Sequence, residues 1–382
     1  MNLRVRATMS VIGALLLLPV LGGTARSTAA GEVVEASPTT VYLAPGKLLK
    51  VPVKAWHLRY RSTSATGAAN VVSGTLLVPR TPYLLGRRPI AGYAVGSHGM
   101  GDQCAPSNAM AKGTEAELAI MSLMLLKGWA VAVTDYEGLG TPGDHTYMAG
   151  ISQGHAVLDS IRAATRVGEA GLSGDAPVVV MGYSQGGSSA AWAAQLQPSY
   201  APELRLKGVA AGGVPADLQA VADNLDGTPD FGLAAAAGLG LDAAYPELSL
   251  ASYLTPEGAA LFAGARDDCV AELRSALAGR RLSELTTTDV MHRPDWQARL
   301  QENRLGGTAP RVPMFLYHAK GDEIIPYGVG GTLRKEYCAR GVRVLWTGLP
   351  AGSHVVGAVE GGPLAVAWLA GRVVGLPVVT NC

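Results

Sequence analysis

Segments suited to buried strands alternate with segments suited to helices along most of this chain. Apolar runs of strand length occur within 71–80, 89–101, 129–138, 176–184 and 206–218, and again within 312–326 and 342–350. Between several of them, at 115–127, 154–168 and 188–197, apolar residues recur at helical spacing. Because strands separated by such helices pair in parallel, the pattern predicts an α/β fold with a mostly parallel central sheet and helices on both faces.

The alternation stops between residues 212 and 310. This stretch is rich in Ala and Gly, carries runs typical of helices such as "FGLAAAAGLGLDAAYPEL", and contains no convincing strand. We therefore expect a core formed by 31–211 and 311–382, interrupted by a helical cap or lid insertion at 212–310. A last apolar helix is expected in "GPLAVAWLAGRVVGL", near the C-terminus.

The N-terminus has the layout of a secretory signal peptide. Arg4 and Arg6 precede a short apolar run at 11–18, and small residues follow it up to Ala30. The run is short for a membrane span, which makes an uncleaved anchor the weaker alternative. The sequence therefore predicts a signal peptide at 1–30 and a secreted, extracellular mature chain.

The composition limits the classes of partner. Hydrophobic residues make up 48% of the chain and charged residues only 16%, which favours a sizeable buried core. The formal net charge is +1 and there is no basic run, so no nucleic acid partner is expected. No phosphate-cradling loop or zinc-finger spacing occurs, so no cofactor is expected.

The four cysteines, Cys104, Cys269, Cys338 and Cys382, are an even number in a chain that we expect to be exported. Two disulfides are therefore predicted, and three connectivities are open. A Cys338–Cys382 pair would fix the last residue of the chain, which would otherwise fray. None of the four stands at C-x-x-C spacing, so neither a metal nor a redox site is expected.

Two copies of the pattern G-x-S-x-G occur, and their contexts differ. Ser184 lies in "VVVMGYSQGGSSAAWAAQL", where a buried strand meets a helix. There, Gly182 and Gly186 allow the close backbone approach of a nucleophile elbow, a sharp turn that exposes the hydroxyl. Ser152 follows no strand and opens a helical segment, where we expect it to cap the helix. We predict Ser184 as a nucleophile; the alternative is a surface serine in a glycine-rich turn.

A serine nucleophile needs a base, and the base needs an orienting acid. On the α/β-hydrolase fold these partners follow the serine in the order acid, then histidine, on loops beyond later strands. His354 follows the apolar run 342–350 and is the predicted base, whereas His318 lies inside a strand and is expected to be packed. Asp322, at the exit of the preceding strand, is the predicted acid, with Glu323 as the competitor.

The same chemistry requires two N–H donors for the developing oxyanion. The first is predicted to be the backbone of Gln185, the residue after the nucleophile. The second is expected in the loop "VGSHGMGDQC", because His98-Gly99-Met100-Gly101 is similar to the HGGG-type loop of lipases and esterases. Gly99 and Met100 both remain candidates. The alternative is a glycine turn that is merely tethered by Cys104.

Several of these segments together resemble the secretory lipase family, which includes the yeast lipase A type. The similar segments are "YRSTSATGAANVVSGTLLVP", "DQCAPS", "GHAVLDSIRAA", "GYSQGG", "YHAKGDEIIPY" and "GSHV", and they span essentially the whole mature chain. The resemblance implies the α/β-hydrolase fold and a catalytic triad of Ser184, Asp322 and His354.

The resemblance also implies the disulfides Cys104–Cys269 and Cys338–Cys382. It implies action on esters of fatty acids, with the acyl chain held in a tunnel through the cap. One departure concerns His98-Gly99, because the yeast type has an acidic residue near this position. This departure affects which residue of the loop is the oxyanion donor.

We therefore predict a carboxylic ester hydrolase, a lipase or esterase that acts on triacylglycerol-type substrates through an acyl-enzyme intermediate. Burial of an acyl chain, at roughly 0.8 kcal/mol per CH₂, favours a lipid-like ester. The expected partner is an ester or lipid at a lipid–water interface, and no obligate protein partner is expected. Two alternatives remain. One is a secreted serine peptidase, in which Asp267, Asp268 and Glu272 would hold an ammonium group, and the other is a catalytically silent lipid-binding protein.

Overall fold

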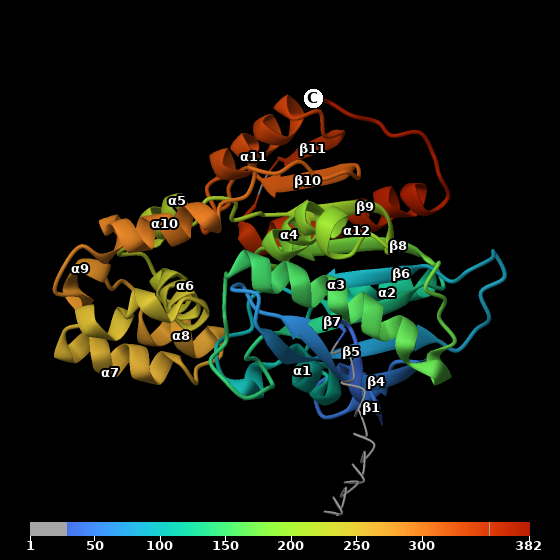
Figure 1. Cartoon of the computed structure of the whole chain (residues 1–382), viewed down its shortest axis with the longest axis horizontal. Coiled ribbons are helices and arrows are strands. Elements are labelled where there is room, and N and C mark those ends of the chain that lie inside the picture. The colour runs from blue at the N-terminus through green and yellow to red at the C-terminus, as the bar shows by residue number, and fades with distance from the viewer. Residues whose placement is uncertain (1–28, 351) are drawn as a thin grey trace, which may run out of the picture.

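Nine strands form the central sheet, in the order β1-β4-β5-β7-β6-β8-β9-β10-β11 (Figure 1). The computed structural model describes residues 29–350 and 352–382. Neighbouring strands run parallel from β7 to β11, and they run antiparallel from β1 to β7. The strands are β1 (Val33–Thr39), β4 (Val53–Thr63), β5 (Ala69–Pro79), β6 (Ile90–Ala94), β7 (Ala130–Tyr136), β8 (Pro177–Tyr183), β9 (Arg205–Gly212), β10 (Met314–Ala319) and β11 (Val344–Leu349), beside a separate hairpin of β2 (Tyr42–Ala44) and β3 (Leu48–Lys50). This sheet confirms the predicted mostly parallel architecture.

Two strands of the antiparallel edge, β1 and β4, are not predicted from the sequence. Strand β4 alternates buried residues such as Trp56, Leu58 and Tyr60 with half-buried polar ones, and β1 has no fully buried residue. Antiparallel strands that are covered on one side alternate in this way, so they lack the continuous apolar runs of the central strands. The missed strands are therefore those with the weakest apolar signal.

Helices cover both faces of the sheet, as predicted. Helices α3 (Gly150–Arg166) and α4 (Gln185–Tyr200) pack on one face, and α2 (Leu118–Leu126) and α12 (His354–Val373) pack on the other (Figure 1). The core also contains α1 (Pro106–Lys112) and α11 (Tyr327–Ala339). The expected last helix is present as α12. It begins earlier than expected, at His354, because the Ser353 side chain caps it by accepting the N–H of Val356.

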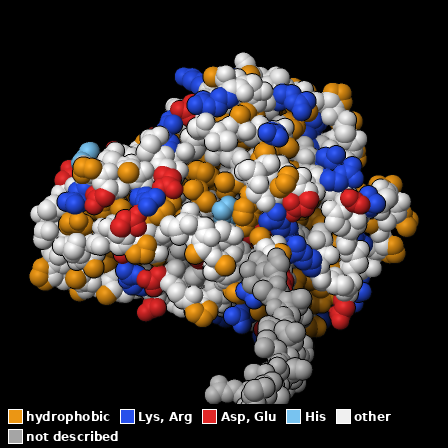
Figure 2. All heavy atoms as spheres, in the orientation of Figure 1, with side chains coloured by type: hydrophobic (Ala, Val, Ile, Leu, Met, Phe, Trp, Pro, Cys, Tyr) orange, Lys and Arg blue, Asp and Glu red, His pale blue; other side chains and the backbone are white. Residues whose placement is uncertain are grey.

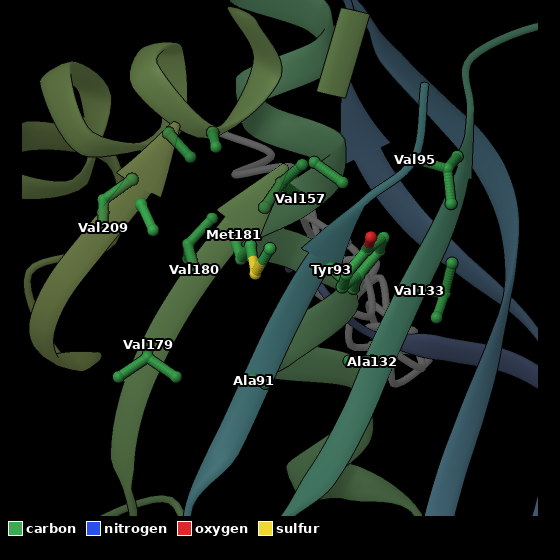
Figure 3. Packing of buried hydrophobic residues seen from close by; sticks show 14 of the residues in the cluster. Ala91, Tyr93, Val95, Ala132, Val133, Val157, Val179, Val180, Met181 and Val209 are labelled. Carbon is green, nitrogen blue, oxygen red and sulfur yellow. The ribbon is translucent and has the colours of Figure 1, made fainter. Parts of the chain in front are cut away.

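Strands β6 and β8 lie at the centre of the main core. Figure 3 shows Ala91 and Tyr93 of β6 near Val179, Val180 and Met181 of β8, and all five are at most 2% exposed. Strands that are buried on both faces read as continuous apolar runs, which is why these segments are recognisable in the sequence. Their packing fixes the carboxyl ends of both strands, where the loops of the candidate site begin.

Between β9 and β10 the described chain forms helices and adds no strand to the central sheet. The helices are α5 (Leu218–Leu225), α6 (Phe231–Ala244), α7 (Pro256–Ala265), α8 (Val270–Ala276), α9 (Leu282–Leu285) and α10 (Pro294–Glu302). Their buried side chains, including Phe231, Leu239, Phe262, Leu273 and Trp296, form an apolar cluster separate from the main core. We term residues 213–313 the helical segment, and it lies at the left of Figure 1, beyond one end of the sheet.

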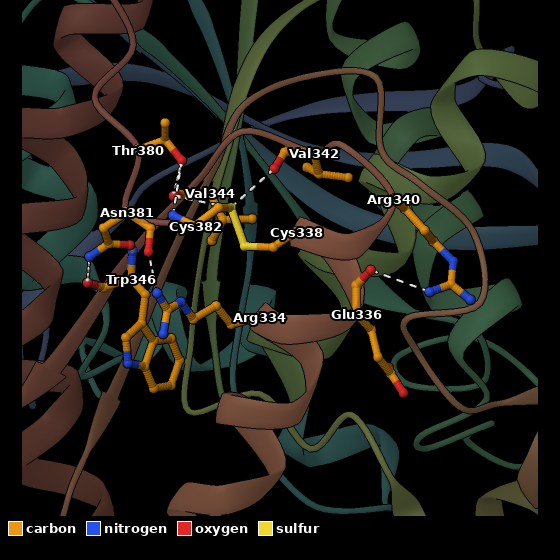
Figure 4. The surroundings of a disulfide bond; sticks show 10 residues. All are labelled: Arg334, Glu336, Cys338, Arg340, Val342, Val344, Trp346, Thr380, Asn381 and Cys382. Atoms are coloured by element: carbon orange, nitrogen blue, oxygen red, sulfur yellow. Dashed lines mark hydrogen bonds between the residues drawn. A yellow bond between two sulfur atoms is a disulfide. The ribbon is translucent and has the colours of Figure 1, made fainter.

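Two disulfides confirm the pairing implied by the family resemblance. Cys104–Cys269 joins the core to the helical segment, with a Cα–Cα distance of 5.5 Å. Cys338–Cys382 joins α11 to the last residue, at 5.4 Å (Figure 4). Beside the second disulfide, the Asn381 side chain accepts the backbone N–H of Trp346 and donates to its carbonyl oxygen, both at 2.8 Å. The C-terminal residues are thus fastened to the edge strand β11.

The predicted signal peptide at 1–30 lies almost wholly outside the described residues, which begin at residue 29. In the part of the chain that is described, no helix combines the length and apolar character needed to cross a bilayer. Cleavage near Ala30 stays a prediction.

Replacing Cys338 and Cys382 together by serine is expected to lower the free energy of unfolding by about 2–4 kcal/mol. The physical reason is that the disulfide restricts the unfolded chain across a sequence separation of 44 residues. Urea denaturation followed by tryptophan fluorescence measures the change. Substitution of the exposed Ser275 by alanine is the control and should leave the midpoint in place. An unchanged midpoint in the double variant would contradict a stabilising role for this disulfide.

Candidate active site

Ser184 stands on a sharp turn between β8 and α4. Its backbone adopts φ 59° and ψ −124°, a strained conformation for a residue with a Cβ, and its N–H donates to the carbonyl oxygen of Gly212 at 3.0 Å. Close glycine packing surrounds the turn. A methyl group on Gly186 would lie 2.0 Å from the carbonyl oxygen of Ala94, and one on Gly182 would lie 2.1 Å from that of Gly186. Such strain persists only where the surrounding structure enforces it, and it is typical of functional turns.

The second copy of the motif has a different setting. Ser152 lies inside α3, whose N-cap is Ala149 without a side-chain capping bond, so the predicted capping role is wrong. The Ser152 hydroxyl instead donates to the Glu137 carboxylate, which also accepts from Thr146. Ser152 is 1% exposed. A buried serine with a fixed acceptor is structural.

His354 and Asp322 are in direct contact. His354 is the first residue of α12, and its Nδ1 lies 2.8 Å from Oδ2 of Asp322, in the loop after β10. The other carboxylate oxygen of Asp322 accepts the backbone N–H groups of Ile324 and Ile325, at 3.1 and 2.8 Å. Because these bonds fix the carboxylate, they also orient the imidazole ring through Nδ1.

A second histidine also contacts the same carboxylate. Nε2 of His318 lies 3.2 Å from Oδ2 of Asp322 and 2.9 Å from the carbonyl oxygen of Ile325. Burial raises the pKa of Asp322, but the hydrogen bonds to His318 and His354 outweigh burial and hold this pKa well below its usual range. Glu323, the competing acid, accepts the backbone N–H of His354 and does not contact its ring. Asp322 is therefore the charged partner of the imidazole.

Tyr183 connects the turn to the histidine. Its hydroxyl donates to the carbonyl oxygen of His354 at 2.7 Å, and the centres of the two rings are 4.9 Å apart. Because Tyr183 immediately precedes Ser184, the serine and the imidazole lie at the same edge of the sheet. The side-chain hydrogen bond of His354 goes to Asp322, and none within the described residues joins it to the Ser184 hydroxyl. In enzymes without bound substrate this contact is often open.

The buried Glu115 and the half-buried Glu117 hold the loop that follows β6. Oε1 of Glu117 accepts the backbone N–H of Gly96 at 2.6 Å, and Oε2 accepts the Tyr93 hydroxyl at 2.8 Å. The Glu115 carboxylate lies 2.6 Å from Nε2 of His98, whose Nδ1 lies 2.9 Å from the carbonyl oxygen of Gly96. Neither glutamate is singled out by the sequence, because acidic residues before an apolar helix are ordinary helix-start signals.

His98, Glu115 and Glu117 place charged groups next to the loop after β6. Burial lowers the pKa of His98, but the hydrogen bond and the charge of Glu115 outweigh burial and raise it to about 9. His98 and Glu115 therefore form an ion pair at neutral pH. Burial, together with the Glu115 charge, raises the pKa of Glu117 to about 7. Glu117 thus exchanges a proton near neutral pH while its oxygen accepts the Gly96 N–H.

The loop also pairs with the backbone of the helical segment. The N–H of Met100 donates to the carbonyl oxygen of Asp268 at 2.8 Å. The Met100 backbone N–H therefore already has an acceptor, which favours another residue of the loop as the oxyanion donor. The backbone of Gly99 pairs with that of Cys269 in an antiparallel manner, as in a β-sheet. Gly99 has φ 125°, a conformation that glycine adopts readily. The loop and the helical segment are therefore joined at this point.

Helix α4 begins at Gln185, directly after the turn. The first N–H groups of a helix have no acceptor within the helix, so the Gln185 backbone N–H is positioned as a donor. The side-chain nitrogen of Gln185 lies 3.4 Å from Nε2 of His145. Burial lowers the pKa of His145 to about 4, so this imidazole is neutral. The sequence does not identify His145, because it lies in an irregular loop without a recognisable motif.

An apolar cavity of about 490 Å³ lies within the helical segment. Its lining includes Leu218, Phe231, Leu241, Phe262 and Trp296. Ser184 and His354 do not line it, but Met100 and Tyr147 belong to the same apolar cluster as the helices. The Tyr147 hydroxyl lies 2.5 Å from Oγ of Ser97. The cluster thus extends from the helical segment to the loop after β6.

The fold is similar to that of a solved lipase. The X-ray structure of Candida antarctica lipase A in its closed state has a TM-score of 0.84 and 25% sequence identity to this chain, and the match covers 92% of this chain and 84% of that one. The sheet, the turn at Ser184 and this likeness together define an α/β-hydrolase, and the chain is a carboxylic ester hydrolase.

The family follows from the sequence comparisons. A family model described as secretory lipase matches residues 104–381. Lipase 5 of Candida albicans is 31% identical over an alignment of 376 positions, which covers 93% of this chain and 80% of that protein. A protein of Mycobacterium tuberculosis named a probable inactive lipase is 29% identical, over 86% of this chain and 76% of its own length. The chain belongs to the secretory lipase family, which confirms the resemblance read from the sequence.

Gly186→Ala is expected to lower the free energy of unfolding by about 1–3 kcal/mol, because its methyl group would overlap the carbonyl oxygen of Ala94. Gly174→Ala is the matched control, because no atom lies within 4 Å of the added methyl group. Urea denaturation of both variants measures the difference. Equal midpoints for the two variants would rule out the close packing described for this turn.

Proposed function

We propose that this chain hydrolyses esters of fatty acids, of the triacylglycerol type, with Ser184 as nucleophile, His354 as base and Asp322 as orienting acid. The observation that carries the proposal is the 2.8 Å contact between Asp322 and His354 beside the strained turn at Ser184. Membership of the secretory lipase family supports lipase activity. The geometry supports the assignment of the three side chains.

The reaction consists of two acyl transfers. Nε2 of His354 takes the proton of the Ser184 hydroxyl as the serine oxygen attacks the ester carbonyl carbon. The tetrahedral intermediate then breaks the ester C–O bond, and the alcohol leaves with the proton that His354 returns. Water attacks the acyl-enzyme by the same route and releases the fatty acid. Asp322, which its two histidine contacts keep charged, stabilises the imidazolium formed in each step.

The oxyanion is bound by the backbone N–H of Gln185 and by one N–H of the loop after β6. In that loop the N–H groups of Gly96 and Met100 are already engaged, and Gly99 packs against the helical segment. Ser97 follows Gly96, where an added methyl group would lie 3.5 Å from the carbonyl oxygen of the residue before the nucleophile. The N–H of Ser97 is therefore the second donor, in place of Gly99 or Met100.

The helical segment acts as the cap that holds the acyl chain. Its cavity of about 490 Å³ is lined mainly by apolar side chains, and each CH₂ buried there contributes roughly 0.8 kcal/mol to binding. The apolar cluster continues through Met100 and Tyr147 to the loop at Ser97. It therefore gives the acyl chain an apolar route from the cavity toward the turn at Ser184. Residues 1–30 act as a signal peptide, and the mature chain works outside the cell at a lipid–water interface.

A series of p-nitrophenyl esters and triacylglycerols of increasing acyl length tests this function. The wild type is expected to hydrolyse esters of medium or long acyl chains, and Ser184→Ala should lower kcat by about four orders of magnitude or more. Ser152→Ala, in the other G-x-S-x-G copy, is the matched control and should retain activity. A fluorophosphonate probe should label Ser184, as read by mass spectrometry.

The outcomes separate the alternatives. Equal activity of the Ser184→Ala variant and the wild type would overturn the assigned nucleophile. A peak at short acyl chains would indicate a carboxylesterase, and cleavage of peptide amides without ester hydrolysis would indicate a serine peptidase. A wild type that neither reacts with the probe nor hydrolyses esters would indicate a silent lipid-binding protein.

Glu117→Ala is expected to lower kcat for a soluble ester by about 10–100-fold and to leave KM within about twofold. Without its acceptor, the Gly96 N–H no longer fixes the neighbouring N–H of Ser97. Glu117→Gln keeps an acceptor oxygen and should restore most of the lost kcat, which a general loss of stability would not do. Circular dichroism checks the fold of each variant, and a wild-type kcat in Glu117→Ala would exclude this positioning role.

A further inference from the structure

An exposed apolar loop lies at the end of the molecule away from the helical segment. Residues 80–89, "RTPYLLGRRP", connect β5 to β6, and Leu84 and Leu85 are 87% and 81% exposed. Leu126, at the end of α2, is 83% exposed. These are the three most exposed large hydrophobic side chains in the described part of the chain. Figure 1 shows the loop at the right, opposite the helical segment.

Hydrogen bonds and aromatic packing join this loop to the end of α2. Arg88 donates to the carbonyl oxygens of Gly128 and Thr81, at 2.5 and 2.6 Å. Its guanidinium lies 5.9 Å from the centre of the Tyr83 ring, and Tyr83 packs against the main core and next to Gly128. The loop 80–89 and the end of α2, which carry the three leucines, are therefore held in place by the rest of the fold.

Cationic side chains lie in the same loop as Leu84 and Leu85 and line a groove beside it. A groove of about 360 Å³ beside the loop is lined in part by Lys54, Arg80, Arg87 and Arg88. Lys127 follows Leu126 and is exposed. Of the nearby acids, Asp175 pairs with Arg87 at 3.1 Å, and Glu169 lines an adjoining cavity. Figure 2 shows hydrophobic side chains next to Lys and Arg side chains at this right-hand end.

We propose that this surface docks the protein on an anionic lipid surface. We term it the basic leucine face, and it consists of Leu84, Leu85 and Leu126 with Lys54, Arg80, Arg87 and Lys127. An anionic bilayer offers phosphate groups to the cations and an apolar boundary to the leucines. A soluble phosphate would engage the cations but leave the leucines in water. The coincidence of the two features is what points to a lipid.

Docking through this face holds the candidate active site away from the bilayer. The loop 80–89 enters the amino end of β6, whereas Ser184 follows the carboxyl end of β8. The two strands are parallel neighbours, with Ile90 opposite Val178 and Ala94 opposite Gly182. The basic leucine face therefore retains the protein at a membrane without presenting that membrane to the catalytic serine. This inference does not rest on the proposed hydrolysis.

Sedimentation with vesicles tests the proposal. The full chain carrying Ser184→Ala, which prevents turnover of the lipid, is mixed with vesicles of phosphatidylcholine alone or with added phosphatidylglycerol. Binding to the anionic vesicles should be at least about tenfold tighter than to the neutral ones, and salt should weaken it. Leu84→Ser/Leu85→Ser/Leu126→Ser should weaken binding at least about tenfold. Lys54→Gln/Arg80→Gln/Arg87→Gln should weaken it similarly and reduce the salt dependence.

The control is Leu48→Ser/Leu49→Ser, because these leucines of the β2–β3 hairpin are also exposed, at 63% and 71%. This variant should bind like its parent. Equal binding to neutral and anionic vesicles, or undiminished binding by the triple leucine variant, would overturn the proposal. So would stronger competition by inorganic phosphate than by chloride at equal ionic strength, which would indicate a site for a soluble anion. Circular dichroism and, with Ser184 intact, unchanged hydrolysis of p-nitrophenyl butyrate separate docking from folding and catalysis.

Discussion

The close approach of the turn at Ser184 to the end of β6 is the contact on which the whole site depends. Only a residue without a Cβ fits at Gly186, because the carbonyl oxygen of Ala94 occupies the space that a methyl group would take. This contact fixes the strained backbone of Ser184 and brings the loop after β6 next to it. The neighbouring Tyr183 then contacts His354, so that groups from three distant parts of the chain meet at one edge of the sheet.

Two carboxylates near the carboxyl ends of the central strands, Asp322 and Glu117, differ in charge for a physical reason. Asp322 has two imidazoles as neighbours, and their hydrogen bonds outweigh the cost of burial. Glu117 lies next to another carboxylate, so burial and repulsion act in the same direction and favour its protonated form. The first arrangement keeps a permanent negative charge behind His354. The second places an acceptor beneath Gly96 whose charge changes near neutral pH.

The parts of the fold that the sequence predicts are those governed by local patterns. The buried strands β6 and β8 appear as continuous apolar runs, and Ser184 is recognisable because a strand, glycines and a helix adjoin it. Asp322 and His354 follow from their order along the chain and their positions after strands. Strands β1 and β4 are missed because their faces are only partly covered. The engaged N–H of Met100 and the role of Glu117 are not visible in the sequence, because their hydrogen-bond partners are set by tertiary packing and not by neighbouring sequence.

Cys269 links the helical segment to the core of the molecule. Cys269 carries both the disulfide to Cys104 and the backbone pairing with Gly99, so the start of α8 is fixed to the loop beside the turn at Ser184. The helical segment therefore cannot lift away as one rigid lid without dragging that loop with it. Any opening of the helical segment has to be a rotation about Cys269. The helices farthest from Cys269 then undergo the largest displacement.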